Sequence, residues 1–193
     1  GSLQRCRAQW ASRRSSVFVA GEESGGNLAA ALALIARDRR TALAGQILVS
    51  PMLDPVMGTC SVRSADAGAV GCPWADGWHA YLGSPEKAEH PYAAPLNASR
   101  LAGVAPALVL TAEDDPLRDE CEAYAGHLRD AGVRVQHHVL PGPTGWPFVF
   151  SAPTNDAALS ASWAPVVVDH LKIFFASAAG PRRTAASAHS MLA

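Results

Sequence analysis

The chain lacks closely spaced cysteines. Its four cysteines, Cys6, Cys60, Cys72 and Cys121, stand far apart, and no C-x-x-C pair occurs. Structural zinc sites and disulfide frameworks normally bring several cysteines together at short spacings. We therefore expect no metal site, no cofactor, and reduced, mostly buried thiols in a cytoplasmic protein. A disulfide between Cys60 and Cys72 is the alternative in an oxidising compartment.

The chain also lacks an excess of positive charge and long apolar runs. Its net charge is −1, with 17% charged residues. Binding to nucleic acid or to an anionic membrane surface normally requires a basic excess. The apolar runs are too short, or too interrupted by charge, to span a bilayer. These absences exclude a nucleic-acid partner and a membrane span, and leave small molecules and proteins as partners.

What is present is a pattern of apolar runs that alternate with helix-forming runs. The 193 residues suit one domain with a sizeable core. Strands are predicted at 16–20, 45–50, 106–112 and 133–140, and helices at 3–13, 24–37, 117–131 and 157–178. This alternation predicts an α/β fold with a parallel sheet and helices on both faces. The last strand has the mixed polarity of a sheet edge.

The segment 52–100 is rich in proline and glycine and is expected to be irregular, with one short helix at 74–82. Trp74, Trp78 and Tyr81 follow helical spacing there, which is typical of core packing and is also compatible with a substrate pocket. We predict one domain over residues 1–179, with 52–100 running over the site. Residues 180–193 are predicted to be a flexible tail.

Three loops should meet at one edge of the sheet. The carboxyl ends of parallel strands gather the functional loops, which here are 21–27, 113–120 and 141–148. The first reads Gly-Glu-Glu-Ser-Gly-Gly-Asn between a strand and a helix, the setting of the nucleophile elbow G-x-S-x-G. The second contains Asp-Pro-Leu-Arg-Asp-Glu at 115–120.

These motifs resemble the C-terminal part of α/β hydrolases of the hormone-sensitive-lipase-like esterase group. That group reads G-D-S-A-G-G-N or G-E-S-A-G-G-N at the elbow and D-P-L-R-D-E at the acid loop. The resemblance covers roughly residues 10–178, and includes Ser-Pro-Met-Leu-Asp at 50–54. It implies a carboxylesterase or lipase-like hydrolase that acts on a small ester, or binds an acyl ligand.

The resemblance also assigns the site residues. Glu23 falls on the nucleophile position, where a carboxylate attack would give an anhydride, a poor intermediate for turnover. Ser24 is the alternative nucleophile, although the family geometry uses only the backbone N–H of that residue. Asp115 takes the position of the catalytic acid. Gly25 and Trp146 are assigned to substrate binding.

The base is missing from its family position. A Ser-His-Asp mechanism needs an imidazole oriented by a buried carboxylate, and the family supplies it from H-G-F in the last loop. Here that position falls near Gly145 or Trp146. We expect His137 and His138 to face opposite sides of a strand, His127 to face solvent, and His170 to be a packing or surface residue. His79 and His90 lie in the irregular segment and could reach a pocket, although nothing in the sequence requires it. The chain is therefore expected to be an inactive or very weak esterase, or alternatively a non-catalytic binding protein.

The family's H-G-G-G motif and several strands precede the elbow, and this chain begins after them. We therefore expect the front half of the sheet to be absent, leaving the strand at 16–20 with a bare edge. A shortened expressed form, a fragment, and strands supplied by a second copy or another chain are the three alternatives.

Several acidic residues lie near the predicted site. Glu113 and Asp114 add negative charge to the acid loop, so the mouth of the site should be acidic. Glu22, Glu23 and Asp115 should crowd together and raise at least one carboxyl pKa. A retuned acid–base pair and a lost catalytic role are both compatible with this pattern. Glycoside chemistry and a divalent metal are disfavoured, because no aromatic sugar platform and no ligand set accompany the carboxylates.

Overall fold

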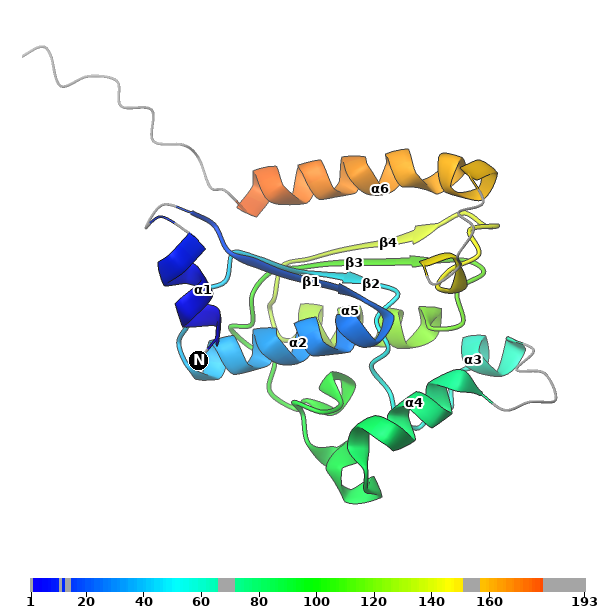
Figure 1. Ribbon diagram of the computed structural model, residues 1–193, viewed down its shortest axis with the longest axis horizontal. Coiled ribbons are helices and arrows are strands. Elements are labelled where there is room, and N and C mark those ends of the chain that lie inside the picture. The colour runs from blue at the N-terminus through cyan, green and yellow to red at the C-terminus, as the bar shows by residue number, and fades with distance from the viewer. Residues whose placement is uncertain (1, 11, 13–14, 66–71, 151–156, 179–193) are drawn as a thin grey trace, which may run out of the picture.

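A four-stranded parallel sheet with helices on both faces forms the centre of the molecule (Figure 1). The computed structural model describes residues 2–10, 12, 15–65, 72–150 and 157–178. The strands lie in chain order, β1 (Phe18–Glu22), β2 (Gly45–Val49), β3 (Ala107–Ala112) and β4 (Val135–Leu140). Helices α2 (Glu23–Asp38) and α5 (Arg118–Asp130) cover one face, and α6 (Ala157–Ala178) covers the other. The predicted fold class is confirmed.

The remaining elements are short. They are α1 (Ser2–Trp10), α3 (Cys60–Ser64), α4 (Pro73–Leu82) and the 3-10 helices η1 (Pro85–Glu89), η2 (Pro95–Asn97) and η3 (Phe148–Phe150). The prediction of a single helix within 52–100 was wrong, since α3, η1 and η2 also lie there. Tertiary contacts fix α3, because Ser61 N–H donates to the Asp119 carboxylate and Ser61 Oγ donates to the Pro116 carbonyl.

The first strand is displaced from its predicted position. It runs through Glu22, because Phe18 pairs with Gly45 and Glu22 pairs with Val49. Helix α2 follows without an intervening loop and begins at Glu23, one residue earlier than predicted. The sequence places three glycines and two glutamates at this junction, and local propensity alone would interrupt both elements there. The predicted tail at 180–193 lies outside the described residues.

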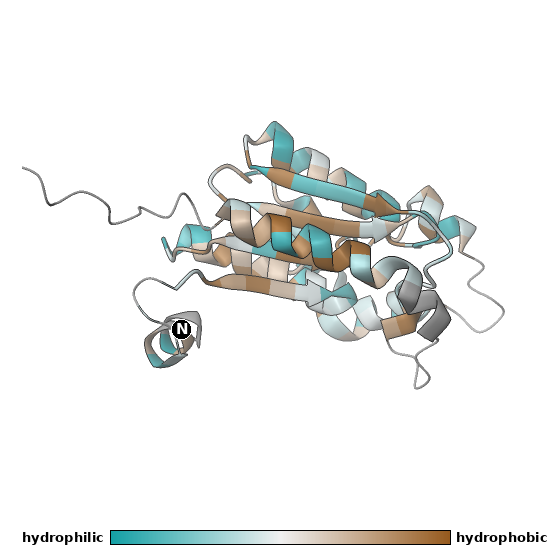
Figure 2. Cartoon of the chain, turned by 90° about the horizontal axis from the view of Figure 1, so that it is seen from above, coloured by the Kyte–Doolittle hydropathy of each residue, from teal (hydrophilic) through white to brown (hydrophobic). Residues whose placement is uncertain are grey.

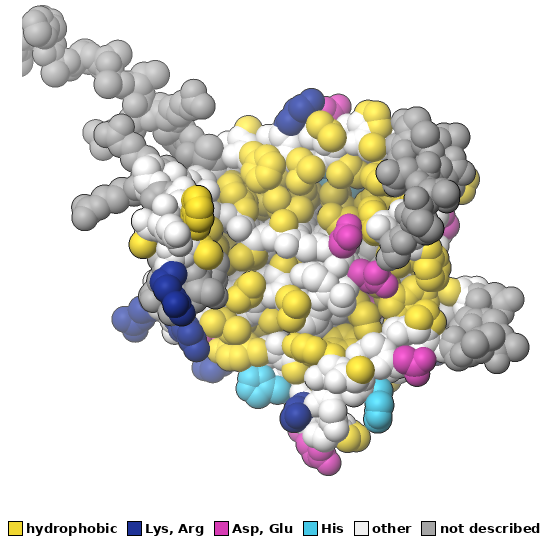
Figure 3. All heavy atoms as spheres, in the orientation of Figure 1, with side chains coloured by type: hydrophobic (Ala, Val, Ile, Leu, Met, Phe, Trp, Pro, Cys, Tyr) yellow, Lys and Arg dark blue, Asp and Glu magenta, His cyan; other side chains and the backbone are white. Residues whose placement is uncertain are grey.

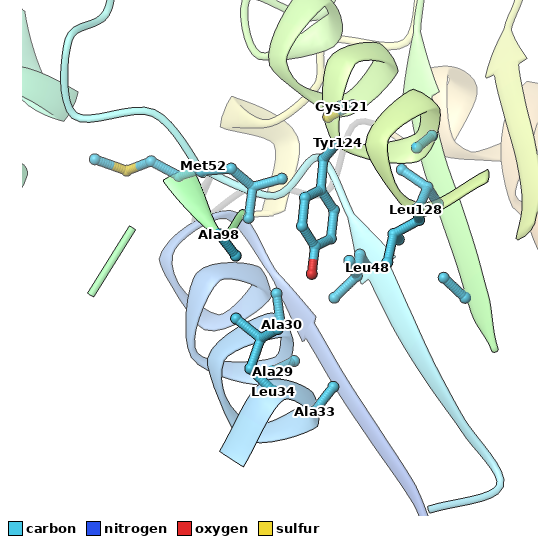
Figure 4. Close-up of a cluster of buried hydrophobic side chains, with 14 of the residues drawn as sticks. Ala29, Ala30, Ala33, Leu34, Leu48, Met52, Ala98, Cys121, Tyr124 and Leu128 are labelled. Carbon is cyan, nitrogen blue, oxygen red and sulfur yellow. The ribbon is translucent and has the colours of Figure 1, made fainter. Parts of the chain in front are cut away.

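The core has one layer on each face of the sheet. The larger layer lies between the sheet and α2 and α5, where Tyr124 of α5 extends toward Ala30 and Ala33 of α2 (Figure 4). The small alanines let α2 approach the sheet closely. The second layer lies under α6 and includes Ile47, Leu108, Leu110, Leu140, Trp146 and Phe174. Because β3 is covered on both faces, all six of its residues are buried.

The two edges of the sheet differ in character. At one edge, β4 is hydrophilic in its middle residues, whereas β3 beside it is hydrophobic (Figure 2). At the other edge, β1 pairs with β2 and with no other described strand. Hydrophobic side chains spread over the face of the molecule on which β1 lies in front (Figure 3). The edge predicted to be bare is therefore open within the described part of the chain.

Candidate active site

The strand-to-helix junction has the geometry of a tight elbow. Glu23, its central residue, has a φ of 49°, in the left-handed region that side-chain-bearing residues rarely adopt. A Cβ atom on Gly21 would lie 2.1 Å from the carbonyl oxygen of Gly25. A Cβ atom on Gly26 would lie 2.8 Å from Cβ of Pro51. Glycine is therefore required at both positions, and the junction presents the side chain of Glu23 at the end of β1.

The carboxylate of Glu23 is engaged by a tryptophan of α4. Trp74 Nε1 donates a hydrogen bond of 2.8 Å to Glu23 Oε1. The ring of Trp74 also contacts that of Phe148 in the last loop, with centroids 5.3 Å apart. In addition, the backbone N–H of Met52 donates to the Glu23 carbonyl. Glu23 therefore joins the elbow to the segment after β2 and to α4.

Ser24 lies on the first turn of α2 and is exposed. It lines a pocket of about 270 Å³ between the start of α2 and α4. The other described residues that line this pocket are Asn27, Leu28, Met52, Gly77, Trp78 and Tyr81. None of these residues carries a carboxylate. The acidic mouth expected at the site loops stays a prediction.

Asp115 is buried at the end of β3, with only 2% of its surface exposed. Its Oδ2 accepts a hydrogen bond of 2.6 Å from Thr111 Oγ1, and its Oδ1 accepts one of 2.9 Å from the Leu117 N–H. Burial raises the pKa of Asp115, against the lowering effect of hydrogen bonds from Thr111 and the Leu117 backbone. The neighbouring charge that raises this pKa is that of Asp114, whereas we expected it from Glu22 and Glu23.

Asp114, expected only to add negative charge to the mouth of the site, binds the last loop. Its carboxylate accepts hydrogen bonds from the N–H and Oγ1 of Thr144 and from the N–H of Gly145, at 2.7 to 2.9 Å. Burial alone would raise the pKa of Asp114, but these bonds outweigh it and the pKa is lowered. They bring the acid loop and the last loop together, as predicted. Gly145 has a φ of 71° and offers no side chain there.

Glu120 was missed as a site-supporting residue. It is 1% exposed, and its Oε2 accepts hydrogen bonds from the N–H groups of Leu53 and Asp54. Burial, together with the charges of Asp54 and Asp115, raises the pKa of Glu120 from 4.5 to about 8. The complete match to D-P-L-R-D-E was the signal, since its final glutamate fixes the segment that follows β2.

The two residues assigned to substrate binding are not in the described wall of the pocket. A Cβ on Gly25 would have no atom within 4 Å, so this position borders open space. Trp146 is 1% exposed and packs against Phe150 and Trp163 in the core layer under α6. A role of either residue in substrate binding stays a prediction.

The histidines of the described residues lie in several parts of the fold. His138 stacks on His170 of α6, with ring centroids 3.6 Å apart. Burial lowers the pKa of His137, and the other contributions come from Arg129 and Glu122 of α5, on the opposite side of the sheet from α6. This arrangement confirms that His137 and His138 face opposite sides. His79 and His90 are exposed near α4 and η1, and His127 is exposed on α5.

The comparisons with known proteins agree with this geometry. Residues 2–144 match a family described as having the alpha/beta hydrolase fold. The chain belongs to this α/β hydrolase family. Its esterase resemblance is confirmed by an arylesterase of Saccharolobus solfataricus, 34% identical over 123 residues, and an ethyl acetate hydrolase of Pseudomonas putida, 38% identical over 132 residues. The matches cover 62% and 65% of this chain, and 40% and 41% of those proteins.

Two further similar proteins are a plant receptor and an esterase of known structure. A gibberellin receptor of Arabidopsis thaliana is 36% identical over 127 residues, which are 62% of this chain and 36% of the receptor. The structure of a Pyrobaculum calidifontis esterase matches with a TM-score of 0.73 and 29% identity, over 92% of this chain and 59% of that one. The chain of this α/β hydrolase therefore spans about two fifths of the length of the curated relatives named here.

Within the described residues, no group of three or more histidines, cysteines and carboxylates is placed to hold a metal ion. No helix in that part of the chain has the length and apolar character needed to cross a membrane.

Proposed function

We propose that this α/β hydrolase chain binds a small ester or acyl-like molecule and hydrolyses it weakly or not at all. The hydrogen bond between Glu23 and Trp74 carries the proposal, because it engages the side chain at the position where the family has its nucleophile. A nucleophile must be free to reach its target, and here the Glu23 carboxylate is held in a partly buried hydrogen bond by Trp74, which is 4% exposed.

The surroundings of Asp115 support the same proposal. In a Ser-His-Asp mechanism the buried acid accepts a hydrogen bond from the imidazole and orients it. Thr111 and the Leu117 backbone donate to Asp115 instead, and an interaction with the side chain of Ser50 also acts to lower its pKa. The last loop approaches through Thr144 and Gly145, which are tied to Asp114. Neither residue can accept a proton from a nucleophile as an imidazole does.

The relatives are compatible with both versions of the function. The names of the ethyl acetate hydrolase and the arylesterase describe enzymes that act on esters, whereas the name of the gibberellin receptor describes a receptor. The specific observation that favours binding over turnover is the same Glu23–Trp74 contact. A lipase-like preference for long acyl chains is the less favoured version, because the pocket beside the elbow is only about 270 Å³.

Ser24 provides the sharpest test of turnover. Its exposed side chain lines the pocket, and it is the one aliphatic hydroxyl among the described lining residues, beside the phenol of Tyr81. We expect no hydrolysis of p-nitrophenyl acetate above the rate in buffer, for either the wild-type chain or Ser24→Ala. Turnover that disappears in Ser24→Ala would overturn the proposal and would identify Ser24 as a displaced nucleophile.

A partner at the β1 edge is a further part of the proposal. The Val17 carbonyl accepts a hydrogen bond from Ala44 N–H, on the β2 side. Because alternate residues of a strand turn their peptide groups to opposite edges, Phe18, Ala20 and Glu22 turn theirs away from β2. An open strand edge favours pairing with another strand, supplied by a second copy or by another polypeptide. Slow amide exchange at Phe18 and Ala20 in an assembly, and fast exchange in a monomer, would support this; slow exchange in a proven monomer would contradict it.

The cytoplasmic location is proposed on the cysteines alone. All four are free in the structure, but Cys121 alone is buried and Cys6 and Cys60 are exposed, so the expectation of mostly buried thiols was wrong. A reducing compartment would keep the thiols free.

A further inference from the structure

We propose that the pocket between α2 and α4 binds an uncharged ligand that carries one aromatic or short apolar group and one carbonyl oxygen, and that Glu23 acts as a positioning residue that holds the wall of this pocket. The inference rests on the binding role proposed above and names its ligand class.

The pocket is apolar and contains no described charged lining residue. Its walls are formed by Leu28, Met52, Trp78 and Tyr81, and Gly77 adds no side chain to it. Tyr81 and Leu28 are 49% and 50% exposed. A charged ligand group would lose its hydration there without gaining a partner. Small-molecule sites are typically apolar clefts of this kind with a few polar groups that fix orientation.

Two donors lie in the same wall. Ser24 brings a hydroxyl from the first turn of α2. Tyr81 brings a phenolic hydroxyl from α4, and its side chain is 49% exposed. Hydroxyl groups donate hydrogen bonds. A ligand carbonyl oxygen accepts from both hydroxyls, which is why we assign a carbonyl to the ligand.

The wall is held in place from both sides. Asn27 Nδ2 donates to the carbonyls of Met52 and Ala93, which fixes the segment after β2 against α2. On α4, Trp74 donates to Glu23 Oε1 at 2.8 Å, one helical turn before Gly77 and Trp78. The spacing of the α2 start and α4 therefore depends on a contact made by the residue at the elbow. A carboxylate at this position has a role in shaping the pocket that a serine could not fill.

The probe for this site is 4-phenyl-2-butanone, which has an aromatic ring and a carbonyl and contains no ester bond. Isothermal titration with the full chain should give a Kd of about 0.1–1 mM, the range expected for a ligand of this size. The carboxylate 4-phenylbutyrate should bind at least about tenfold more weakly. Tryptophan fluorescence should change with the same Kd, since Trp78 lines the pocket.

The matched variants are two helical glycines. Gly77→Leu fills the pocket, since a Cβ at Gly77 lies 3.9 Å from Met52 Cε, and should weaken ketone binding at least about tenfold. Gly126→Leu, on α5, has no atom within 4 Å of its Cβ and lies outside the described lining, so it should leave the Kd unchanged. Equal binding by both variants, or no binding by the wild type, would overturn the site.

The positioning role has its own pair of variants. Glu23→Gln keeps an acceptor for Trp74 and should retain the Kd within about twofold, whereas Glu23→Ala removes it and should weaken binding about fivefold. Glu22→Ala, at the exposed neighbouring residue, is the control and should match the wild type. Wild-type affinity in Glu23→Ala, with an unchanged circular dichroism spectrum, would refute the positioning role.

The failure of this inference can be told apart from failure of the proposed function. Ester hydrolysis together with pocket-dependent ketone binding would refute only the proposal of weak turnover. Absence of both hydrolysis and ketone binding would refute only the site.

Discussion

Trp74 donates its indole N–H to the carboxylate of Glu23, across 51 positions of sequence. The acceptor is the residue at the centre of the elbow, with a φ of 49°, and the donor lies in the first turn of α4. This one hydrogen bond links the strained turn that the family reserves for its nucleophile to the helix that walls the adjacent pocket. It explains physically how a glutamate fits there: the carboxylate has a fixed neutral donor.

Restoring the family serine should not by itself restore an esterase. We expect Glu23→Ser to hydrolyse p-nitrophenyl acetate no faster than the wild type, because an unactivated serine hydroxyl is a weak nucleophile. The rate of ester hydrolysis is measured spectrophotometrically, and the rate in buffer alone is subtracted. The single variant is compared with the double variant that carries both Glu23→Ser and Gly145→His. Activity in the single variant would show that another histidine already serves as base.

The two glycines that flank the elbow should respond in opposite ways to alanine. In Gly21→Ala the new Cβ would fall 2.1 Å from the Gly25 backbone oxygen, so we expect a loss of at least about 3 kcal/mol in the free energy of unfolding. In Gly25→Ala the Cβ meets nothing within 4 Å, and the helix gains about 0.5–1 kcal/mol. Urea denaturation of both variants measures this difference. Similar midpoints for the two would show that the elbow is not as tight as the structure gives it.

Glu120 should make the protein less stable as the pH rises. Its pKa is raised from 4.5 to about 8 in the folded state, so between these values the folded state binds a proton that the unfolded state has lost. Stability from this group is therefore full below pH 4.5 and is lost progressively up to about pH 8, by at most about 1.4 kcal/mol per pH unit. Glu120→Gln keeps an acceptor for Leu53 and Asp54 and has no proton to lose. Urea denaturation at about pH 5.5 and about pH 8.5 should show a smaller pH dependence in the variant.

The control for this pH series is Glu122→Gln, on the same helix but exposed. It should keep the pH dependence of the wild type. Identical pH profiles for wild type and Glu120→Gln would mean that Glu120 remains ionised in the fold.

Tyr124 should tolerate loss of its hydroxyl. The side chain is 0% exposed, burial raises its pKa, and its hydroxyl has no hydrogen-bond partner in the described residues. A buried hydroxyl without a partner destabilises a fold, so Tyr124→Phe should be equal to the wild type or more stable by about 1 kcal/mol. Tyr92→Phe, which removes the bond to Asp38, is the comparison and should lose up to about 1 kcal/mol. A lower melting temperature for Tyr124→Phe would mean that its hydroxyl is paired.

The periodic elements were readable because propensity and packing agree in them. The strand at Ala107–Ala112 and the helix at Ala157–Ala178 lie within a residue of their predictions, since long apolar runs fix both. The elbow was shifted because Gly21 and Glu22 are poor strand formers that pair with β2 nonetheless. The helix at Cys60–Ser64 was missed because its contacts to Pro116 and Asp119 come from a distant segment.

The sequence by itself determined the α/β class, the positions of the three site loops and the glutamate at the centre of the elbow. Those features follow from local order along the chain: alternating apolar runs, glycine spacing and the Asp-Pro-Leu-Arg-Asp-Glu motif. The tertiary structure decided what the side chains meet. In it, Trp74 donates a hydrogen bond to Glu23, and Thr144 of the last loop donates one to Asp114. Ser24 lines a pocket together with Trp78. Hydrogen bonds of this kind join residues far apart in sequence, and no local pattern specifies which distant donor a carboxylate will meet.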